Sequence, residues 1–325
     1  MPMVENVLSV EGLKVHFPIR SAMLRRRIGT VRAVDGVDLT VARGETLALV
    51  GESGCGKTTT GKAILRLVDS TEGAIRIGGE DIAHHDARKL APFRRRMQII
   101  FQDPHASLNP RLSVGAILAA PFEIHDIGTK ADRADRVAAL LATVGLPGEA
   151  ARRYPHEFSG GQRQRIGIAR ALTLSPELII GDEPVSALDV SIQAQIINLL
   201  ARLRAELGLS FLFISHNLAV VAHIADRVAV MYLGRVVETA QREELFFDAR
   251  HPYTQALLSA VPEPVPGGRR QRQVLAGDVP NPANPPSGCG FHPRCPQAMA
   301  ICAQVAPAPR MISPTHSVAC HLVSP

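Results

Sequence analysis

Residues 46–60 read TLALVGESGCGKTTT, and this stretch decides which kind of fold the chain can adopt. The segment Thr46–Val50 is almost wholly apolar, as a buried parallel strand requires. Gly51–Thr58 fits the pattern G-x-x-x-x-G-K-[ST], and a helix is predicted from Lys57 to Val68. A strand, a glycine-rich loop and a helix in this order place backbone N–H groups and a helix N-terminus round a phosphate chain. The stretch therefore predicts an α/β fold that binds a nucleoside triphosphate.

Individual loop residues have distinct expected roles. Lys57 is expected to reach the β- and γ-phosphates, and Thr58 to ligate Mg²⁺. Two roles are possible for Cys55: a small side chain that fills the loop, or a redox-sensitive thiol. The other expected nucleotide contacts in the loop are Gly51, Ser53, Gly54, Cys55, Gly56 and Thr59. A chance glycine-rich turn is the structural alternative for the motif as a whole.

A second motif, ELIIGDE at residues 177–183, ends an apolar strand in two carboxylates. Asp182 suits the Mg²⁺ shell as the acidic partner of Thr58. Glu183 is adjacent and can orient or deprotonate the water that attacks the γ-phosphate. Pro184 ends the strand sharply. The pair predicts hydrolysis as well as binding.

A third motif, FSGGQRQR at residues 158–165, opens a predicted helix with a hydroxyl and two glycines. This is a second anion-binding device in the same chain. One nucleotide does not need two such devices from one subunit. We therefore expect a dimer in which this motif closes on the ATP of the partner.

Together these motifs resemble the ATP-binding subunits of ABC transporters, over nearly the whole chain. Segment 159–162 matches the family's signature, and segment 186–189, SALD, matches its D-loop. Gln102 matches the Q-loop glutamine, and His216 the switch histidine. The resemblance implies an α/β P-loop ABC ATPase core with an inserted α-helical subdomain, an antiparallel β part and a small Cys/Pro-rich C-terminal module.

The resemblance also implies roles for residues outside the loop. Gln102 would bind the metal and link the attacking water to the membrane subunits, and His216 would contact the γ-phosphate. Asp189 would communicate across the dimer interface, and Phe17 would stack on adenine. A buried structural histidine and a core phenylalanine are the alternatives for His216 and Phe17. The signature residues that would contact the partner's nucleotide are Ser159, Gly160, Gly161 and Gln162.

Four further segments are similar to the oligopeptide and dipeptide importers within that family. They are VRAVDGV at 31–37, QDPHASLNPR at 102–111, HPYTQALL at 251–258 and FHPRCP at 291–296. The similarity implies ATP hydrolysis that powers import of di- and oligopeptides. Nickel or glutathione import by the same machinery stays open. A soluble ABC ATPase acting on nucleic acid or ribosomes is a competing interpretation, as is a regulatory ATPase that senses redox or iron.

The same resemblance implies partners and a location. A second ATPase subunit, commonly a related chain, would pair with this one, although an intact motif set leaves a homodimer open. Two transmembrane permease subunits would bind the pair, an extracytoplasmic peptide-binding protein would act indirectly, and nucleic acid would not be a partner. No apolar run reaches about 18 residues, and Met1–Val10 lacks a secretory pattern. We expect a peripheral protein at the cytoplasmic face of the membrane. The formal net charge of +6 fits an anionic membrane surface or nucleic acid equally.

Composition divides the chain. We predict an ATPase domain at 1–261, with its helical subdomain at about 103–174 and a basic, irregular insertion at 18–32. Thirteen of the 24 prolines follow residue 260, which excludes long helices there. A linker is therefore predicted at 262–288 and a Cys-rich module at 289–325, whose few large apolar residues predict little core of its own.

Four of the five cysteines lie in that module, with spacing C-x₅-C-x₆-C-x₁₇-C. Four thiolates suit an iron–sulfur cluster or Zn²⁺, and the C-x₂-C pairs of zinc ribbons are absent. Similar tails in some peptide-importer ATPases imply a [4Fe–4S] cluster. Its predicted ligands are Cys289, Cys295, Cys302 and Cys320, and the cofactors are then ATP, Mg²⁺ and this cluster. Zinc, with His292, His316 or His321 as substitutes, and free thiols are the alternatives.

Overall fold

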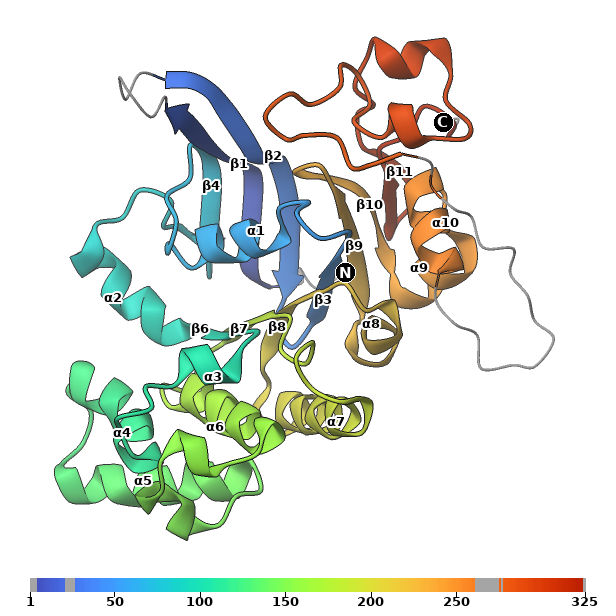
Figure 1. The fold of residues 1–325 in the computed structure, drawn as a ribbon. Helices are drawn as coiled ribbons and strands as arrows, with labels where there is room; N and C mark the ends of the chain where they lie inside the picture. The colour runs from blue at the N-terminus through green and yellow to red at the C-terminus, as the bar shows by residue number, and fades with distance from the viewer. Residues whose placement is uncertain (1–4, 21–26, 261–274, 276, 324–325) are drawn as a thin grey trace. The chain divides into compact units, whose positions relative to one another are not determined.

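The computed structural model describes residues 5–20, 27–260, 275 and 277–323 (Figure 1). Contacts divide the chain into two compact units. Unit 1 comprises Met1–Val7, Ala42–Glu45 and His85–Phe213, and unit 2 comprises Leu8–Val41, Thr46–His84 and Ile214–Pro325. Within the described ranges, no helix has both the length and the apolar character needed to cross a membrane.

Unit 1 is built round a short run of strands, of which β6 (Met97–Ile100) and β7 (Leu178–Asp182) pair in parallel. All five residues of β7 are buried, as are those of β8 (Ser210–Ser215), most of which belongs to this unit. The register sets Ile100 opposite Gly181, so the carboxyl ends of β6 and β7 meet at one edge. This edge carries the acidic motif.

Helices make up most of the rest of unit 1, which confirms the predominantly helical character predicted for residues 103–174. Two of them begin at a capping box, formed by Thr129 before α5 and by Ser159 before α6. Helix α4 packs on α5 and α6, and Val114 and Leu118 of α4 and Leu141 of α5 are buried. The helices are α2 (Ala87–Arg96), α3 (Pro104–Ser107), α4 (Val114–Ile124), α5 (Lys130–Thr143), α6 (Gly160–Leu172) and α7 (Val190–Leu207), with 3₁₀ turns at Gly148–Arg152 and Pro155–Glu157.

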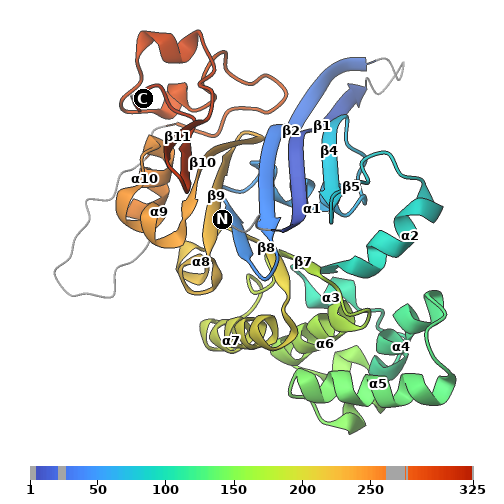
Figure 2. The ribbon, with the colours of Figure 1, turned by 180° about the vertical axis from the view of Figure 1, so that it is seen from behind.

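Unit 2 contains an antiparallel sheet in the order β2-β1-β4-β5 and a run of strands in the order β11-β12-β10-β9-β3 (Figure 2). In the run, β3 pairs with β9 in parallel, and β9, β10, β12 and β11 pair antiparallel. The strands of the antiparallel sheet are β1 (Asn6–Arg20), β2 (Arg27–Ala42), β4 (Glu72–Ile77) and β5 (Glu80–Asp81). Those of the run are β3 (Thr46–Val50), β9 (Arg227–Tyr232), β10 (Arg235–Gln241), β11 (Arg310–Ser313) and β12 (His316–Val318).

The helices of unit 2 are short. They are α1 (Lys57–Ile64), α8 (Leu218–Ile224), α9 (Arg242–Asp248) and α10 (Pro252–Ser259), with 3₁₀ turns at His292–Arg294 and Ala300–Ala303. Helix α1 ends at Ile64, earlier than the predicted Val68, because Leu65–Val68 forms a turn. Side chains of α10, β9 and the C-terminal residues share one hydrophobic cluster that includes Tyr253, Tyr232 and Phe291.

The prediction of an irregular insertion at Pro18–Arg32 is wrong for the residues of this range that the structure describes, 18–20 and 27–32. Strand β1 continues to Arg20 and β2 begins at Arg27, while residues 21–26 lie outside the described residues. Basic residues suggested a loop, but a strand with one solvated face accommodates charged side chains. Two long neighbouring strands therefore replace the expected insertion.

The C-terminal tail (residues 289–323) is built onto unit 2. Strand β12 pairs with β10 at Glu238 and Val318, and Val318 and Phe291 are fully buried. The few apolar side chains of this segment complete a core that belongs mainly to β9, β10 and α10, so the tail packs well although it supplies little core of its own. Of the predicted linker, 262–288, residues 262–274 and 276 lie outside the described residues.

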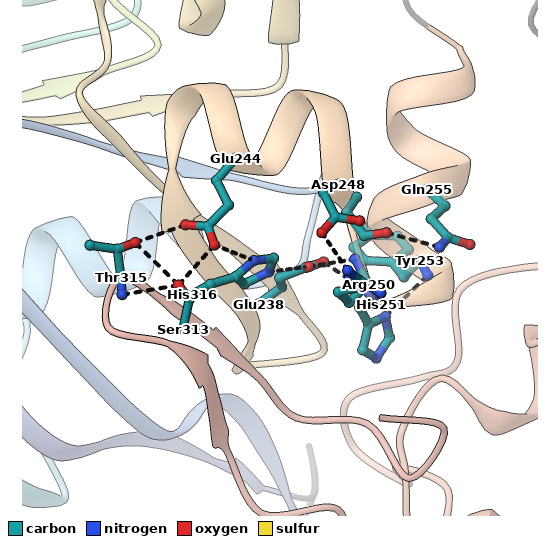
Figure 3. A network of polar contacts seen from close by, with 11 residues as sticks. Glu238, Glu244, Asp248, Arg250, His251, Tyr253, Gln255, Ser313, Thr315 and His316 are labelled. Carbon is teal, nitrogen blue, oxygen red and sulfur yellow. Dashed lines mark hydrogen bonds and ion pairs between the residues drawn. The ribbon is translucent and has the colours of Figure 1, made fainter. Parts of the chain in front are cut away.

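A buried polar network also ties the tail down (Figure 3). His316 of β12 contacts the carboxylates of Glu238 at 2.7 Å and Glu244 at 3.3 Å, and its side chain is fully buried. Ser313 donates a hydrogen bond to Glu244 at 2.8 Å, as does Thr315. Glu238 also accepts the backbone N–H of Arg250 at 2.7 Å. These contacts join β11 and β12 to β10 and α9.

Candidate functional site

The phosphate-binding loop of unit 2 follows β3 directly and runs into α1, as the sequence predicts. Gly56 is the N-cap of α1 with φ +108°, a conformation that favours glycine. A Cβ added there would lie 2.1 Å from the carbonyl oxygen of Ala33 on β2. The backbone of β2 therefore packs closely against the loop and leaves no space for a side chain at position 56.

Lys57 lies inside this loop, with 5% of its surface exposed. Its ammonium donates to the carbonyl oxygens of Gly51 at 2.8 Å and Glu52 at 3.0 Å. The Cys55 sulfur lies 3.8 Å from the same nitrogen, and burial raises the pKa of that thiol despite the neighbouring lysine. A buried, protonated thiol fits the role of a small filling side chain better than that of a redox-sensitive one.

The remaining predicted residues of unit 2 differ in exposure. Ser53 and Gly54 are exposed at the loop, while Thr58 and Thr59 in the first turn of α1 are half-buried. Phe17 on β1 is 41% exposed, so it is not a core phenylalanine. His216 is exposed immediately after β8, so it is not a buried structural histidine.

In unit 1, the parallel pair β6 and β7 brings two distant predicted residues together. Gln102 and Glu183 each lie two positions beyond the paired Ile100 and Gly181, and the Gln102 amide donates to the Glu183 carboxylate at 3.1 Å. Asp182 is 6% exposed at the end of β7. Glu183 has φ +49°, which is uncommon for a residue with a side chain. A strained turn thus holds two carboxylates and an amide at one strand edge, an arrangement that can bind a metal and orient water.

The signature segment also lies in unit 1, at the start of α6. The Ser159 hydroxyl accepts the backbone N–H of Gln162 at 3.3 Å, and the Gln162 side chain accepts the N–H of Ser159 at 3.0 Å. This capping box occupies the serine hydroxyl, and both residues are exposed. A Cβ on Gly161 would lie 2.5 Å from Ile192 of α7, so this glycine also permits close packing of α6 against α7.

The D-loop connects β7 to α7 in the same unit. Asp189 caps α7, where its carboxylate accepts the N–H of Ile192 at 3.0 Å and the Ser191 hydroxyl at 2.8 Å. These hydrogen bonds, that of Ile192 first, lower the pKa of Asp189. Asp189 is exposed, charged and held in place by its own helix.

The four tail cysteines gather in one part of unit 2. The Cys289 N–H donates to the Cys302 carbonyl at 2.8 Å. Burial raises the pKa of Cys320, and Cys289, Cys295 and Cys302 raise it further. All four are free thiols.

The gathered thiols are not a ready-made metal site. Over the described residues, no group of three or more Cys, His, Asp or Glu side chains is placed to hold a metal ion. The substitute histidines have other contacts: His316 binds Glu238, His292 contacts the Cys289 carbonyl and His321 the Val305 carbonyl. The arrangement by itself does not fit a four-thiolate cluster, because the ligands would have to move together first.

Two residues at the loop were missed by sequence reasoning. The Tyr253 hydroxyl accepts the backbone N–H of Glu52 at 2.8 Å, and Arg294 pairs with the Glu52 carboxylate at 2.7 Å. Both belong to segments, 251–258 and 291–296, that stood out only by resemblance. Nothing in their spacing from residue 52 indicates that they meet it.

A P-loop in one unit, and an acidic strand end and a capped glycine helix start in the other, define the class of ABC ATPases. Solved structures of that class share the fold. A dimeric structure of the ATP-binding cassette MJ0796 in a post-hydrolysis state bound to ADP and Pi superposes with a TM-score of 0.64 and 26% identity, covering 72% of this chain and 98% of that one. A structure of cbiO1 from Clostridium perfringens gives a TM-score of 0.65 at 26% identity, covering 75% and 92%.

The chain belongs to the ABC transporter family, whose model matches residues 34–186. The model of the oligopeptide/dipeptide transporter C-terminal region matches residues 237–302. The chain is 55% identical to the oligopeptide transport ATP-binding protein AppF of Bacillus subtilis (strain 168), over 98% of both chains. It is also 55% identical to the putative peptide import ATP-binding protein BOV_A0347 of Brucella ovis, over 97% of both. The chain is thus an ATP-binding subunit of the peptide-transporter branch.

Proposed function

We propose that this chain hydrolyses ATP to drive peptide import through an ABC transporter, as the peripheral ATPase at the cytoplasmic face of the membrane. The observation that carries the proposal is the pairing of a complete P-loop with an acidic strand end and a second, outward-facing helix start. Near full-length identity of 55% to an oligopeptide transport ATP-binding protein supports peptides as the cargo class. The membrane subunits choose the individual peptide.

Within this proposal, each site residue has a task. Lys57 and the loop N–H groups hold the triphosphate, with Phe17 on the adenine. Thr58, Asp182 and Gln102 hold Mg²⁺, whose chemistry is to neutralise the β- and γ-phosphate oxygens. Glu183 accepts a proton from the attacking water, and His216 contacts the γ-phosphate.

The partner's ATP is the proposed ligand of the signature. Ser159 is exposed and Gly160 and Gly161 are half-buried at a helix N-terminus, where an anion is favoured. A dimer of two such chains, or of this chain and a related one, forms two composite sites, and Asp189 lies near their interface. Two transmembrane permease subunits complete the transporter.

A mixing experiment tests the composite site. Ser159→Arg and Lys57→Ala chains are each expected to be inactive, since a homodimer of either has two damaged sites. Mixed dimers hold one intact site and one doubly damaged site, so part of the ATPase activity returns. Dimers proven by light scattering that restore nothing would contradict the trans role of Ser159. Peptide-permease subunits recovered with the chain from its native membrane test the transport assignment.

We propose that the tail binds a [4Fe–4S] cluster because four free cysteines lie in this one segment, and their thiols would have to move together to bind it. A cluster would supply a covalent cross-link among the four segments that carry the cysteines. Anaerobically purified protein is then brown and carries about four irons per chain, and Cys295→Ser loses both. Stoichiometric zinc would change the identity of the metal, and four freely alkylated thiols without iron would remove the cluster.

The predicted boundaries at 261 and 289 are kept as part of the same proposal. The match of the C-terminal region to residues 237–302 supports a distinct tail in this family branch. Limited proteolysis that cuts between 262 and 288 and leaves an ATP-binding core of about residues 1–261 tests them.

A further inference from the structure

Glu52, the second residue of the phosphate-binding loop, is held by the C-terminal part of unit 2. Its backbone N–H donates to the Tyr253 hydroxyl of α10 at 2.8 Å. Its carboxylate accepts two hydrogen bonds from the Arg294 guanidinium, at 2.7 and 3.2 Å. Its carbonyl accepts from Lys57 at 3.0 Å. Three separate groups thus fix one residue, and two of them come from far along the chain.

Arg294 is well placed for this contact. Its side chain is 7% exposed and that of Glu52 is 28% exposed, so the pair is shielded from much of the solvent. Two parallel N–H···O bonds form the bidentate geometry in which a guanidinium binds a carboxylate most strongly. The hydrogen bonds to Glu52 raise the pKa of Arg294, so the guanidinium stays charged.

Aromatic side chains position Arg294. Its guanidinium carbon lies 5.9 Å from the ring centre of Tyr232, whose hydroxyl is 3.4 Å from a guanidinium nitrogen. Phe291, three residues earlier, is 1% exposed and packs edge-on against Tyr232 with ring centres 5.3 Å apart. Phe291 also lies 5.4 Å from the ring of Tyr253. The tail therefore enters the core at Phe291 and reaches the loop at Arg294.

We infer that Arg294 is a positioning residue for the nucleotide site: it pairs with Glu52, fixes the first turn of the loop and cancels a negative charge there. The inference rests on the proposed function for the identity of the nucleotide. ATP brings several negative charges to this loop, and an unpaired carboxylate within it would repel them. The C-terminal tail thereby contributes to ATP affinity although it contains none of the nucleotide-binding motifs.

The first experiment compares Arg294→Met and Arg294→Lys. The methionine variant keeps much of the length and loses the charge, and we expect the dissociation constant of MgATP, measured by calorimetry, to rise about tenfold. The lysine variant keeps the positive charge but cannot form the bidentate pair. Its MgATP dissociation constant should therefore lie between those of wild type and Arg294→Met. At saturating ATP, kcat stays within about twofold of wild type, because Arg294 acts on binding rather than on the attacking water. An unchanged dissociation constant for Arg294→Met would overturn the inference.

A double-mutant cycle isolates the pair. In a Glu52→Gln background the carboxylate is absent, so Arg294→Met should change the MgATP dissociation constant by less than about threefold. An equal effect with and without the carboxylate would mean that Arg294 acts independently of Glu52, and the inference fails. Ser313→Ala combined with Thr315→Ala is the matched control, because it removes tail contacts to Glu244 without touching the loop. This control should bind MgATP as wild type does.

A readout without nucleotide separates the inference from the proposed function. Hydrogen exchange of the segment 50–58 in nucleotide-free protein should speed up in Arg294→Met and stay unchanged in the Ser313→Ala, Thr315→Ala control. Unchanged exchange in Arg294→Met overturns the positioning role. A wild-type chain that binds no MgATP would defeat the proposed function, whereas the exchange result still decides whether Arg294 orders the loop.

Discussion

The P-loop and the signature segment are both glycine-rich runs that lead into a helix, yet they differ in burial and in their surroundings. In the P-loop, Lys57 is buried and Gly56 is pressed against the backbone of β2. In the signature, Ser159 and Gln162 are exposed and cap their own helix, and a Cβ on Gly160 would meet only Leu188 at 3.5 Å. The first is completed by contacts within one chain, while the second presents its donors outward.

Two similar motifs thus have different structural requirements. A loop that must surround a phosphate chain needs a fixed shape, and neighbouring backbone supplies it. A helix start that must meet a second molecule needs accessible donors and tolerates looser surroundings. Substitutions should therefore act through loop shape in one region and through assembly in the other.

The largest effect is expected from Glu183→Gln. Loss of a general base lowers turnover by about 10²–10⁴-fold while MgATP still binds to the P-loop. The uncleaved ATP should then hold a dimer that size-exclusion chromatography detects. Adding Ser159→Arg to Glu183→Gln should remove this dimer without weakening MgATP binding, which separates the two regions directly.

Glu177→Gln is the matched control, because Glu177 lies at the opposite end of β7 and pairs with Arg96 at 2.8 Å. Turnover above half of wild type in Glu183→Gln would remove Glu183 from the catalytic role. If the ATP-bound dimer of Glu183→Gln persists after Ser159→Arg is added, the signature segment does not act through dimer assembly, and the proposed difference between the two motifs is wrong.

The second effect concerns the rigid loop. Gly56→Ala forces a Cβ to within 2.1 Å of the Ala33 carbonyl oxygen, so β2 or the loop has to shift. We expect MgATP binding to weaken about a hundredfold, which is about 2.8 kcal/mol, in a calorimetric titration. Gly54→Ala is the control, because its Cβ meets nothing within 4 Å although φ is +80°. Equal losses in both variants would attribute the effect to φ alone.

The third effect concerns the signature helix. Gly161→Ala meets Ile192 at 2.5 Å and should lower the free energy of unfolding by about 1–3 kcal/mol through overpacking between α6 and α7. Gly160→Ala lies one position earlier and makes only an ordinary contact, so it should be neutral or stabilising. Chemical denaturation of both variants checks this. Equal destabilisation would show that Gly160 is as confined as the P-loop glycines.

The smallest effect is a pH dependence of tail attachment. Burial alone lowers the pKa of His316, but the hydrogen bond and charge of Glu238, together with Glu244, outweigh it and raise the pKa above 6.5. The stabilising charge of His316 is therefore fully present below pH 6.5 and is lost as the pH rises through the raised value. Cleavage of the tail by protease should speed up severalfold between pH 6.5 and 8.5.

Two titratable groups near His316 do not change charge in this window. Burial alone raises the pKa of Glu244, but the hydrogen bonds of Ser313 and Thr315, together with the charge and hydrogen bond of His316, outweigh it and lower the pKa, so Glu244 stays ionised. Burial lowers the pKa of His251 to about 4, so that residue stays neutral. In the His316→Gln variant, the rate at which protease cleaves the tail should be independent of pH. A pH slope that survives this substitution would assign the effect to another group.

The motifs and the elements that carry them could be predicted from the sequence. Local signals are strong there: the short apolar run of Thr46–Val50 before a glycine-rich loop favours a buried strand, and the capping pattern at Ser159 favours the start of a helix. The α/β class and the family followed from these segments. The meeting of Gln102 and Glu183, by contrast, depends on the pairing of β6 with β7, which only the structure shows.

Tertiary structure alone decided which distant segments complete the loop and the tail. Arg294 lies 242 residues from Glu52, and His316 lies 78 from Glu238, and no periodicity encodes such pairs. The tail's core could not be predicted either, because Phe291 finds its partners, Tyr232 and Tyr253, on β9 and α10. Burial is a property of the assembled fold, so a segment poor in apolar residues can still be well packed when other elements supply the rest of the core.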